Sequence, residues 1–462
     1  MDMRNRIILF ALWCTPAILL AQDWKDIPVP AKAGNNQMWE LQADVSDDFN
    51  YQFEAADEKA TIADKWTNFY HNHWDGPGTT YWKYNHVAVN GSDLVIKASR
   101  WHQTGESAPV SSWPNKMNKP EAGINAGCIT STQTVQYPVF VEASISVANI
   151  TLASDVWLLS PDDWQEIDII ECYGGADNGN AYFAEFIHLS HHSFERTNNI
   201  VDYQPRDRNS WWARSDVKSW GDYCWNDGNR KYVRVGVNWI SPFHLEYYVD
   251  GELVRVVYDK AFATKKSGTW HYNYPSMTNG TLDMDGGYQK VTSFATGSDY
   301  SFETLQSASD ASGLSVIDPY NHQQGAGMNK AMDIIINVES QDWHVTANRT
   351  PTDADLLDAA KNTMKVDWIR VYKPVQKTGI DDVEAAGIKV YPNPNRGQFT
   401  VNLPKELKQQ SIHVYNVNGQ KVYAGSISGS KHQVNIKNAQ QGIYFLTLNY
   451  EGVPLQKKVM IL

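Results

Sequence analysis

Short segments of alternating hydrophobic and polar residues dominate the chain from Asp44 to about Pro374. Each segment ends at Gly, Asn, Asp or Pro, which is typical of half-buried strands joined by turns. The strands predicted in this way are Leu94–Ala98, Val139–Val147, Val156–Leu159, Tyr232–Asn238, His244–Val249, Leu253–Val257, Ile334–Val338 and Val366–Tyr372. Long helical periodicity is absent, and residues 353–361 predict only a short helix. Many short strands with turn signals predict an all-β fold, either a sandwich or a barrel.

One hairpin and two insertions stand out. Tyr248-Val249-Asp250-Gly251-Glu252-Leu253 places Asp-Gly between two β-type runs, which favours a type I′ turn. Residues 105–122 and 258–314 are long stretches without clear periodicity, rich in turn-forming and polar residues. Loops of this length tend to be functional. We expect both to shape the ends of a binding site, with disordered decoration as the alternative.

Three carboxylates stand within six residues of one predicted strand, as Glu166, Asp168 and Glu171. Residues two apart on a strand share a face, so Glu166 and Asp168 point the same way. Glu171 stands at an odd offset from Glu166 and would point the opposite way in a regular strand. One extra residue, a β-bulge at about Ile169–Ile170, would return it to the shared face.

The carboxylate strand has two interpretations. One is the solvated polar face of an amphipathic strand. Crowding favours the other, because three like charges on one face repel and no Lys or Arg lies between Asp155 and Phe194 to relieve them. Such a cluster pushes pKa values apart, as an acid/base pair requires.

The residues before this strand predict a hairpin that adds a tryptophan to the same face. If the turn at residues 160–163 is centred on Pro161 and Asp162, antiparallel pairing places Trp157 opposite Glu166. An indole beside carboxylates can stack on the apolar face of a sugar. A core tryptophan is the alternative, although three neighbouring carboxylates would be costly there.

Composition narrows the range of partners. The formal net charge is −12, which argues against nucleic acid and anionic membrane surfaces as general partners. The chain has 18 Trp and 24 Tyr at a mean hydropathy of −0.48. This is more aromatic surface than a core needs and suggests exposed platforms for carbohydrate, although most aromatic side chains must serve the core.

The N-terminus, residues 1–21, has the features of a signal peptide: Arg4 and Arg6, then an apolar run from Ile7. The run is short for a membrane anchor, and no later stretch approaches a membrane span. We therefore expect an exported protein.

Few residue patterns suggest disulfides or metals. After removal of the leader, Cys128, Cys172 and Cys224 remain, which permits one disulfide at most, and small buried hydrophobic residues are the favoured interpretation. His188 and His192 share a face of the next predicted strand, but as zinc ligands they lack a suitable third partner.

The sequence Glu-Ile-Asp-Ile-Ile-Glu, from Glu166 to Glu171, resembles the Glu-x-Asp-x-x-Glu signature of family 16 glycoside hydrolases in its bulged form. That family includes β-agarases, β-porphyranases, κ-carrageenases and laminarinases, and the likeness assigns residues 22–374 to a catalytic domain. It implies a jelly-roll β-sandwich with a concave substrate cleft. It further implies Glu166 as the nucleophile, Glu171 as the general acid/base and Asp168 as the helper, without a catalytic cofactor.

A retaining mechanism brings its two carboxyl groups to about 5–5.5 Å from each other. With the bulge, Glu166 and Glu171 are about four strand steps apart, or roughly 13 Å at Cα. Their side chains must therefore lean towards each other over Asp168, which can bond the nucleophile and help keep Glu171 protonated.

Weaker parts of the resemblance concern substrate and calcium. The loop His73-Trp74-Asp75-Gly76-Pro77-Gly78 resembles a loop with a sugar-stacking Trp, here Trp74. Positions matching His192 and Arg196 contact substrate in agarases, and Glu339 matches a cleft-lining acid. Many family members hold a structural Ca²⁺ on the convex face. The ligands that this implies are Asp47, the Gly91 carbonyl and Asp367.

The end of the chain predicts a separate module. Residues 375–382 predict a linker, and residues 383–462 contain strand patterns at Ile412–Asn418, Val422–Ser426, Gln433–Ile436 and Gly442–Leu448. The opening Tyr-Pro-Asn-Pro resembles the C-terminal sorting domain of the type IX secretion system, a small β-sandwich. This implies the type IX machinery as a partner and a secreted or cell-surface location. A small carbohydrate-binding module is the alternative, but no Trp follows Trp368.

The substrate depends on charge, because agarose is neutral whereas porphyran and carrageenans carry sulfate, which needs Arg or Lys nearby. Porphyranase-like members tend to carry an Arg two residues after the cleft Trp, where this chain has Leu159. The Trp74 loop likewise shows Gly-Pro instead of a basic residue. Arg206, Arg208 and Arg214 would reverse this preference if they entered the cleft.

We therefore predict a monomeric, endo-acting β-agarase that cleaves β-1,4 linkages with retention. β-Porphyranase is the second hypothesis. A non-catalytic galactan-binding protein is a third, disfavoured by the three intact carboxylates, and a transglycosylase is a fourth.

Overall fold

The computed structural model describes residues 24–72, 74–101, 117, 119–197, 200–213, 225–226, 229–376, 381–382, 387–450 and 453–462. These form two compact units. The larger comprises the described parts of Met1–Lys32 and Glu40–Lys373, and the smaller comprises Ala33–Trp39 and the described parts of Pro374–Leu462. The predicted signal peptide and residues 105–116 and 118 of the first insertion lie outside the described residues.

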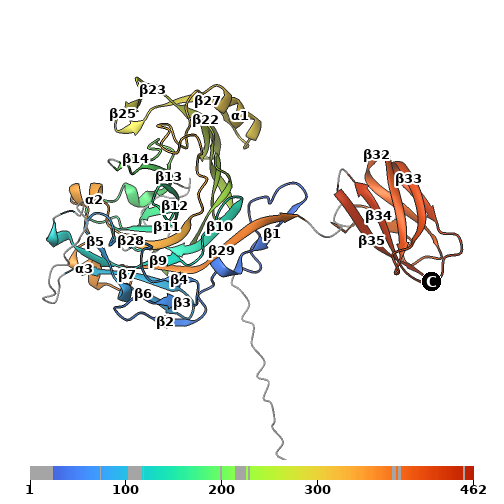
Figure 1. Cartoon of the computed structure of the whole chain (residues 1–462), viewed down its shortest axis with the longest axis horizontal. Coiled ribbons are helices and arrows are strands. Elements are labelled where there is room, and N and C mark those ends of the chain that lie inside the picture. The colour runs from blue at the N-terminus through green and yellow to red at the C-terminus, as the bar shows by residue number, and fades with distance from the viewer. Residues whose placement is uncertain are drawn as a thin grey trace, which may run out of the picture. The chain divides into compact units, whose positions relative to one another are not determined.

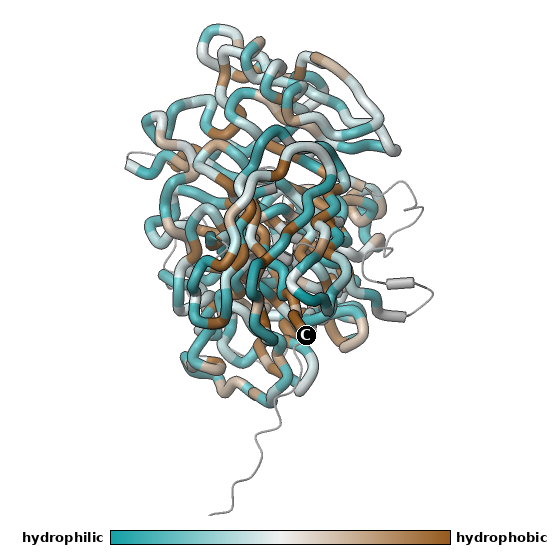
Figure 2. The backbone as a smooth tube through the Cα atoms, turned by 90° about the vertical axis from the view of Figure 1, so that its right-hand side faces the viewer, coloured by the Kyte–Doolittle hydropathy of each residue, from teal (hydrophilic) through white to brown (hydrophobic). Residues whose placement is uncertain are grey.

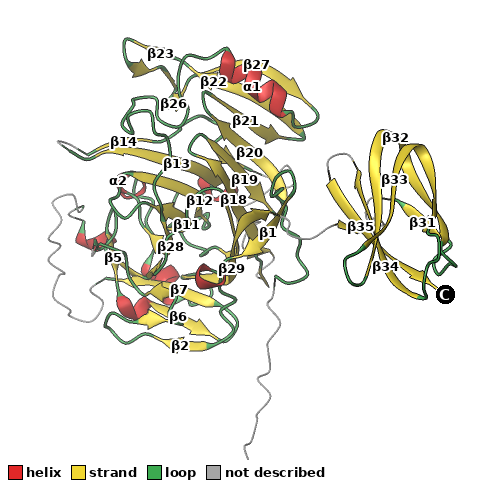
Figure 3. Ribbon diagram, turned by 45° about the vertical axis from the view of Figure 1, so that its right-hand side comes forward, coloured by secondary structure: helices red, strands yellow, loops and turns green. Residues whose placement is uncertain are grey.

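The larger unit is a sandwich of two mainly antiparallel sheets (Figures 1 and 3). The larger sheet runs in the order β2 (Gln52–Glu54), β6 (Val87–Asn90), β7 (Leu94–Arg100), β29 (Thr363–Gln376), β10 (Val139–Ser146), β18 (Val233–Ser241), β19 (His244–Val249), β20 (Glu252–Tyr258), β21 (Ala261–Lys266), β22 (Thr269–Pro275) and β27 (Val291–Gly297). Three more strands join it: β1 (Gln37–Leu41), β5 (Thr80–Trp82) and β8 (Ile124–Ala126).

The second sheet carries the carboxylates and is called the cleft sheet below. Its order is β14 (Val201–Tyr203), β13 (Ile187–Glu195), β12 (Gln165–Tyr173), β11 (Ala153–Leu159), β28 (Asp333–Glu339), β9 (Cys128–Ser131), β4 (Trp66–Thr67) and β3 (Thr61–Ile62), with β15 (Trp211–Trp212) on β13. All strands predicted for this unit are present, most with ends within three residues of the prediction.

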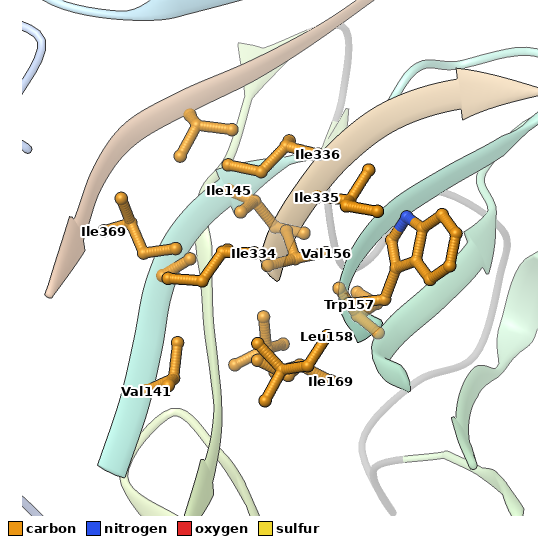
Figure 4. Close-up of a cluster of buried hydrophobic side chains, with 14 of the residues drawn as sticks. Val141, Ile145, Val156, Trp157, Leu158, Ile169, Ile334, Ile335, Ile336 and Ile369 are labelled. Carbon is orange, nitrogen blue, oxygen red and sulfur yellow. The ribbon is translucent and has the colours of Figure 1, made fainter. Parts of the chain in front are cut away.

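The core lies between the two sheets because each contributes one apolar face. Figure 4 shows part of this core, with labelled side chains Val141, Ile145 and Ile369 from the larger sheet and Val156, Leu158, Ile169, Ile334 and Ile336 from the cleft sheet. Hydrophobic and hydrophilic residues are interleaved along the backbone (Figure 2). The cleft sheet therefore has a second face free to carry polar groups.

The Asp250-Gly251 turn confirms the hairpin prediction. Both residues have positive φ, 50° and 80°, as a type I′ turn requires, and Val249 pairs with Glu252.

The second insertion is folded and extends the larger sheet. Strands β21, β22 and β27 pack with helix α1 (Phe302–Asp310) around a separate core of Val256, Ala261, Ala263, Trp270, Tyr272, Leu305 and Ala308. Helix α1 was not predicted, because its buried face is only Leu305, Ala308 and Ser309 within a polar segment. Short strands β23 (Met277–Thr278), β24 (Thr281–Leu282), β25 (Met284–Asp285) and β26 (Tyr288–Gln289) complete it.

Helices are few in the described residues. The short helix predicted over residues 353–361 is α3 (Asp353–Leu357), which begins with a Thr352–Asp355 capping box. Helix α2 (Asp342–Thr346) is too short to show periodicity in the sequence. The remaining elements are η1 (Ala43–Val45), η2 (Tyr84–His86), η3 (Pro120–Ala122), η4 (Phe183–Glu185), β16 (Trp225–Asn226) and β17 (Asn229–Arg230). No helix in the described part of the chain is long and apolar enough to cross a membrane.

The smaller unit is a separate β domain. Its strands are β30 (Asp381–Asp382), β31 (Lys389–Tyr391), β32 (Gln398–Asn416), β33 (Lys421–Asn435), β34 (Gly442–Tyr450) and β35 (Val453–Ile461). They enclose their own core of Ile, Leu, Val, Phe and Tyr side chains. Strand β33 joins the two segments predicted at Val422–Ser426 and Gln433–Ile436, and β32 begins well before the predicted Ile412, with register shifts between Asn402 and Gln410 in its pairing with β33.

Candidate active site

A β-bulge in β12 brings the three carboxylates to one face. Towards β13, Asp168 pairs with Ser190 while Glu171 pairs with His188, so three residues of β12 match two of β13. Ile169 and Ile170 are both buried in the core, whereas Glu166, Asp168 and Glu171 line the same cleft. The predicted bulge at Ile169–Ile170 is confirmed.

The predicted register of the β11–β12 hairpin is wrong by two residues. Trp157 pairs with Asp168, and Leu159 pairs with Glu166. The turn is centred one residue later than predicted, because Ser160 Oγ accepts bonds from the main-chain N–H groups of Trp164 and Gln165, at 3.1 and 3.0 Å. Since the shift is an even number of residues, Trp157 still faces the cleft.

The cleft has a volume of about 600 Å³ and brings together every residue predicted for catalysis or substrate binding. These are Trp74, Trp157, Glu166, Asp168, Glu171, His192, Arg196 and Glu339. It is also lined by residues that were not assigned to the site from the sequence. Among these are Tyr70, Asp155, His188, Asp202, Arg206, Trp211, Gln341 and Trp343.

His192 faces the carboxylates as a cation. Its Nε2 lies 3.5 Å from Glu166 Oε1 and 3.3 Å from Asp168 Oδ2, and its Nδ1 lies 2.8 Å from Asp202 Oδ1. Burial opposes the charge, but Asp202 and Glu166 outweigh burial and raise the pKa of His192 well above its usual range. His192 therefore supplies the positive charge that no Lys or Arg provides between Asp155 and Phe194.

Glu166, Asp168 and His192 are also the residues best arranged to hold a metal in the described part of the chain. Their ligand atoms lie within 4.8 Å of one another. A metal requires a neutral imidazole. The raised pKa of His192 therefore disfavours metal binding at this position.

Glu171 sits in a different environment from Glu166. His188 Nδ1 lies 2.7 Å from Glu171 Oε2, and Tyr173 donates a hydrogen bond to Oε1. Burial raises the pKa of Glu171, but the bond to His188 more than offsets burial, so the net pKa is lowered. Burial raises the pKa of Glu166 well above its usual range, against the opposing effect of His192. The two glutamates thus have pKa values that are pushed apart.

A side-chain amide joins the tryptophan to two further acids. Asn337 accepts a hydrogen bond from Trp157 Nε1 at 2.6 Å and donates to Asp155 Oδ2 and Glu339 Oε2, at 3.0 and 2.9 Å. Burial raises the pKa of Asp155 well above its usual range, and Glu339 adds to the effect. Alternation along β11 and β28 was sufficient to find Asp155 and Asn337, which stand two residues before Trp157 and Glu339.

The loop with Trp74 forms another wall. Tyr70 stacks between Trp82 and Trp157, with ring centroids 5.2 and 6.1 Å away, and meets the edge of Trp74 at 5.5 Å. Gly78 has φ +56°, and an added Cβ would lie 2.6 Å from the Ser340 carbonyl oxygen. The Gly-Pro-Gly sequence therefore lets this loop approach β28 closely.

Two of the arginines considered from the sequence, Arg196 and Arg206, line the cleft, whereas Arg208 does not. Arg196 donates from Nε to the Asp163 carbonyl at 2.5 Å and lies over Phe194. Arg206 lines the cleft, whereas Arg208 lies over the Tyr288 ring at 4.4 Å. Arg214 lies outside the described residues.

The structure describes two of the three predicted cysteines and the surroundings of Asp47, one of the predicted calcium ligands. Cys128 and Cys172 are buried, as expected for small hydrophobic residues, and Cys224 lies outside the described residues. Asp47 already accepts bonds from Phe49 N, Tyr51 Oη and Trp66 Nε1, at 3.1, 2.8 and 2.9 Å. Its carboxylate has about four lone-pair sites, so about one remains for a cation.

Clustered carboxylates beside indole faces in a cleft are the type of site that binds and cleaves polysaccharide. A family model described as "Beta-porphyranase A-D, GH16 domain" matches residues 39–294. Beta-agarase D of Zobellia galactanivorans is 40% identical over 477 aligned residues, 95% of each chain. A beta-agarase of Phocaeicola plebeius is 41% identical over 76% of this chain and 90% of its own.

Solved structures agree. The catalytic domain of beta-agarase D from Zobellia galactanivorans superposes with a TM-score of 0.69 at 45% identity, covering 77% of this chain and all of that one. An inactivated beta-agarase B in complex with agaro-octaose gives 0.54 at 38% identity, with 77% and 100% coverage. The chain belongs to family 16 of the glycoside hydrolases.

The C-terminal unit has its own match. A family model described as "Secretion system C-terminal sorting domain" covers residues 389–462. The predicted type IX sorting domain is therefore confirmed, and the enzyme is secreted or displayed at the cell surface.

Proposed function

We propose that this enzyme is a β-agarase that hydrolyses β-1,4 galactosyl linkages within agarose chains with retention of configuration. The observation that carries the proposal is the bulge in β12, since it gives Glu166 and Glu171 a common face with Asp168 between them. The names of its relatives, all β-agarases among those compared above, support the choice of substrate.

In this mechanism Glu166 attacks the anomeric carbon while Glu171 protonates the leaving oxygen. Water, deprotonated by Glu171, then hydrolyses the glycosyl ester on Glu166. Trp74, Trp157, Arg196 and Glu339 hold the sugar chain. The His192 cation stabilises the negative charge shared by Glu166 and Asp168.

The surroundings of the two glutamates raise the pKa of Glu166 and lower that of Glu171, whereas the first chemical step needs an ionised Glu166 and a protonated Glu171. Neighbouring carboxylates exchange protons as a coupled group. Substrate favours the exchange, because positive charge developing at the anomeric carbon stabilises ionised Glu166 and the glycosidic oxygen accepts a bond from protonated Glu171. The proton therefore moves to Glu171 when substrate binds.

Chemical rescue tests the two glutamate roles. Glu166→Gly and Glu171→Ala should each lower turnover at least about a hundredfold. Azide should restore turnover in both, giving a glycosyl azide of inverted configuration with Glu166→Gly and of retained configuration with Glu171→Ala. The assignments are wrong if either variant keeps full activity or if the two azide products have the same configuration.

β-Porphyranase is a second candidate, because Arg206 lines the cleft and can pair with a sulfate group. A reducing-end assay on agarose, porphyran, κ-carrageenan and laminarin, with the native enzyme and Arg206→Ala, separates the two. If activity is confined to porphyran and is lost in Arg206→Ala, the enzyme is a β-porphyranase and the agarase proposal is wrong.

Structural calcium and a monomeric state are further proposals. The fourth lone-pair site of Asp47, the Gly91 carbonyl and Asp367 would hold the ion. Thermal unfolding with and without a chelator tests it, and an unchanged Tm would remove calcium from the proposal. Light scattering, which measures the molar mass in solution, tests the monomeric state.

A further inference from the structure

The Trp74 loop is tied to the β11–β12 turn by three consecutive side chains. Tyr70 Oη and His71 Nε2 lie 3.0 and 2.8 Å from Asp163 Oδ1. Asn72 Nδ2 donates to Asp163 Oδ2 at 2.5 Å. This convergence on a single carboxylate is not explained by the hydrolytic chemistry, since Asp163 does not line the cleft.

His71 also reaches the other neighbouring strand. Its Nδ1 lies 2.9 Å from Asp333 Oδ2, at the start of β28. The His71 side chain is 10% exposed, and those of Asp163 and Asp333 are 22% and 12% exposed. Both ring nitrogens donate only when the imidazole is protonated. The group His71, Asp163 and Asp333, called the His71 clasp below, is therefore a cation held between two anions.

Asp163 connects the clasp to the substrate cleft from one side. Its main-chain oxygen accepts the bond from Arg196 Nε, and its φ of +60° is a left-handed conformation that needs support from its surroundings. On the other side, Asn72 Oδ1 accepts a bond from the Trp74 main-chain N at 3.2 Å. The clasp thus links two walls of the cleft that the chain itself separates by about ninety residues.

We propose that His71 is a positioning residue whose imidazolium clamps the Trp74 loop against the β11–β12 turn and thereby determines affinity for the sugars that contact Trp74 and Arg196. The inference rests on the proposed galactan hydrolase function. It adds to that function a residue that touches neither substrate nor the reacting atoms.

The charge on His71 gives the clasp a pH limit. Burial opposes protonation, but the hydrogen bonds to Asp163 and Asp333 outweigh burial and raise the pKa of His71 to about 9. The groups that face it are Asp163, Asp333, the ring of Tyr70 and, on the Asp163 main chain, Arg196. Since the folded pKa exceeds the usual value of about 6.5, the contribution of the clasp is complete below that value and is lost as pH rises through about 9.

Binding to an inactive enzyme isolates this effect from chemistry. In full-length Glu166→Gln, the Kd for a soluble agaro-oligosaccharide would be measured by calorimetry from neutral pH to about pH 10.5, with and without His71→Gln. At neutral pH, His71→Gln should weaken binding about tenfold, because charge-assisted bonds are lost. As pH rises through about 9, the parent should weaken towards the His71→Gln value.

Two further variants sharpen the result. His244→Gln removes a histidine that lies 3.7 Å from Glu246 and does not line the cleft, so its curve should follow the parent. Adding Asp333→Asn to His71→Gln removes a carboxylate left without a donor and should restore part of the affinity. Equal Kd values for parent and His71→Gln at neutral pH, or a gap that persists above pH 10, would overturn the proposal.

The clasp and the proposed function fail in different ways. If no galactan binds at any pH, the function is wrong. The clasp is then judged from the NMR titration of the His71 ring, which should have its midpoint near 9, and a midpoint below 7 would overturn it. Thermal unfolding of His71→Gln adds a check, since a lower Tm with unchanged Kd would mean that His71 only stabilises the fold.

Discussion

Asn337 is the residue on which one wall of the cleft depends. It accepts from the Trp157 indole and shares its amide group between Asp155 and Glu339. All four side chains are buried, so losing the amide leaves buried acceptors that are costly to satisfy. The amide thus fixes both the stacking surface and the acids beside it.

Asn337→Ala should lower the free energy of unfolding by about 1–3 kcal/mol, because buried acceptors lose their donor. It should also lower kcat/KM about tenfold or more, since Trp157 loses its orienting bond. Denaturant unfolding and steady-state kinetics on soluble oligosaccharide measure the two effects. Asn238→Ala is the control. Asn238 is also buried and donates a hydrogen bond of 2.9 Å to Glu246, but it does not line the cleft. Equal kcat/KM for both variants would remove Asn337 from the site.

The cleft residues that could be identified from the sequence are those placed by the two-residue period of a strand. The carboxylates could be found because residues two apart on a strand share a face, and Trp157 because residues opposed across a hairpin do. Trp211 and Trp343 could not, since each sits on a short strand or helix end whose position depends on distant partners. Trp211 stacks on His188 at 4.4 Å, a contact between residues that no local pattern relates.

At the scale of elements, the bulge in β12 is the feature with the largest consequence. The count of residues between Asp168 and Glu171 predicts it, because three residues must oppose two for both acids to face the cleft. The hairpin register was not predictable in the same way. The hydrogen bonds of the Ser160 hydroxyl determine where the turn is centred. The pattern of apolar residues is compatible with the predicted centre and with the observed one.

Deleting Ile170 should remove the bulge and still leave Glu171 facing the cleft, because Glu166, Asp168 and Glu171 would then stand at even offsets in a regular strand. Turnover should therefore stay well above that of Glu171→Ala, which should lose at least about a hundredfold. Ile170→Ala keeps the residue count, so it should cost about 2–5 kcal/mol of stability and leave kcat near the native value. Kinetics, with circular dichroism to monitor folding, measures both variants; a folded deletion variant with turnover as low as that of Glu171→Ala would contradict this role of the bulge.

For the whole molecule, the catalytic unit and the sorting domain have separate hydrophobic cores. Each can therefore fold without burying surface on the other. The second insertion belongs to the catalytic unit, and it also supports the cleft, since Gln289 N donates to the Arg206 carbonyl at 3.0 Å.

Ending the chain after Gln376 should leave kcat/KM on soluble oligosaccharide within about twofold of the native value, because the catalytic core is complete. The truncated enzyme should remain inside a producing bacterium that carries a type IX system. Activity assays on purified protein and on culture fractions measure both outcomes. A large loss of activity would show that the sorting domain contributes to the cleft.

The sequence by itself determined the all-β class, the Asp250-Gly251 hairpin, the acid-bearing strand with its bulge and the sorting domain, because each depends on local periods or motifs. Only the tertiary structure decided the hairpin register, the entry of Arg206 into the cleft and the clasp at His71. The His71–Asp333 contact spans 262 residues. Alternation states which face a side chain takes, but which distant side chains share that face follows from how the two sheets pack.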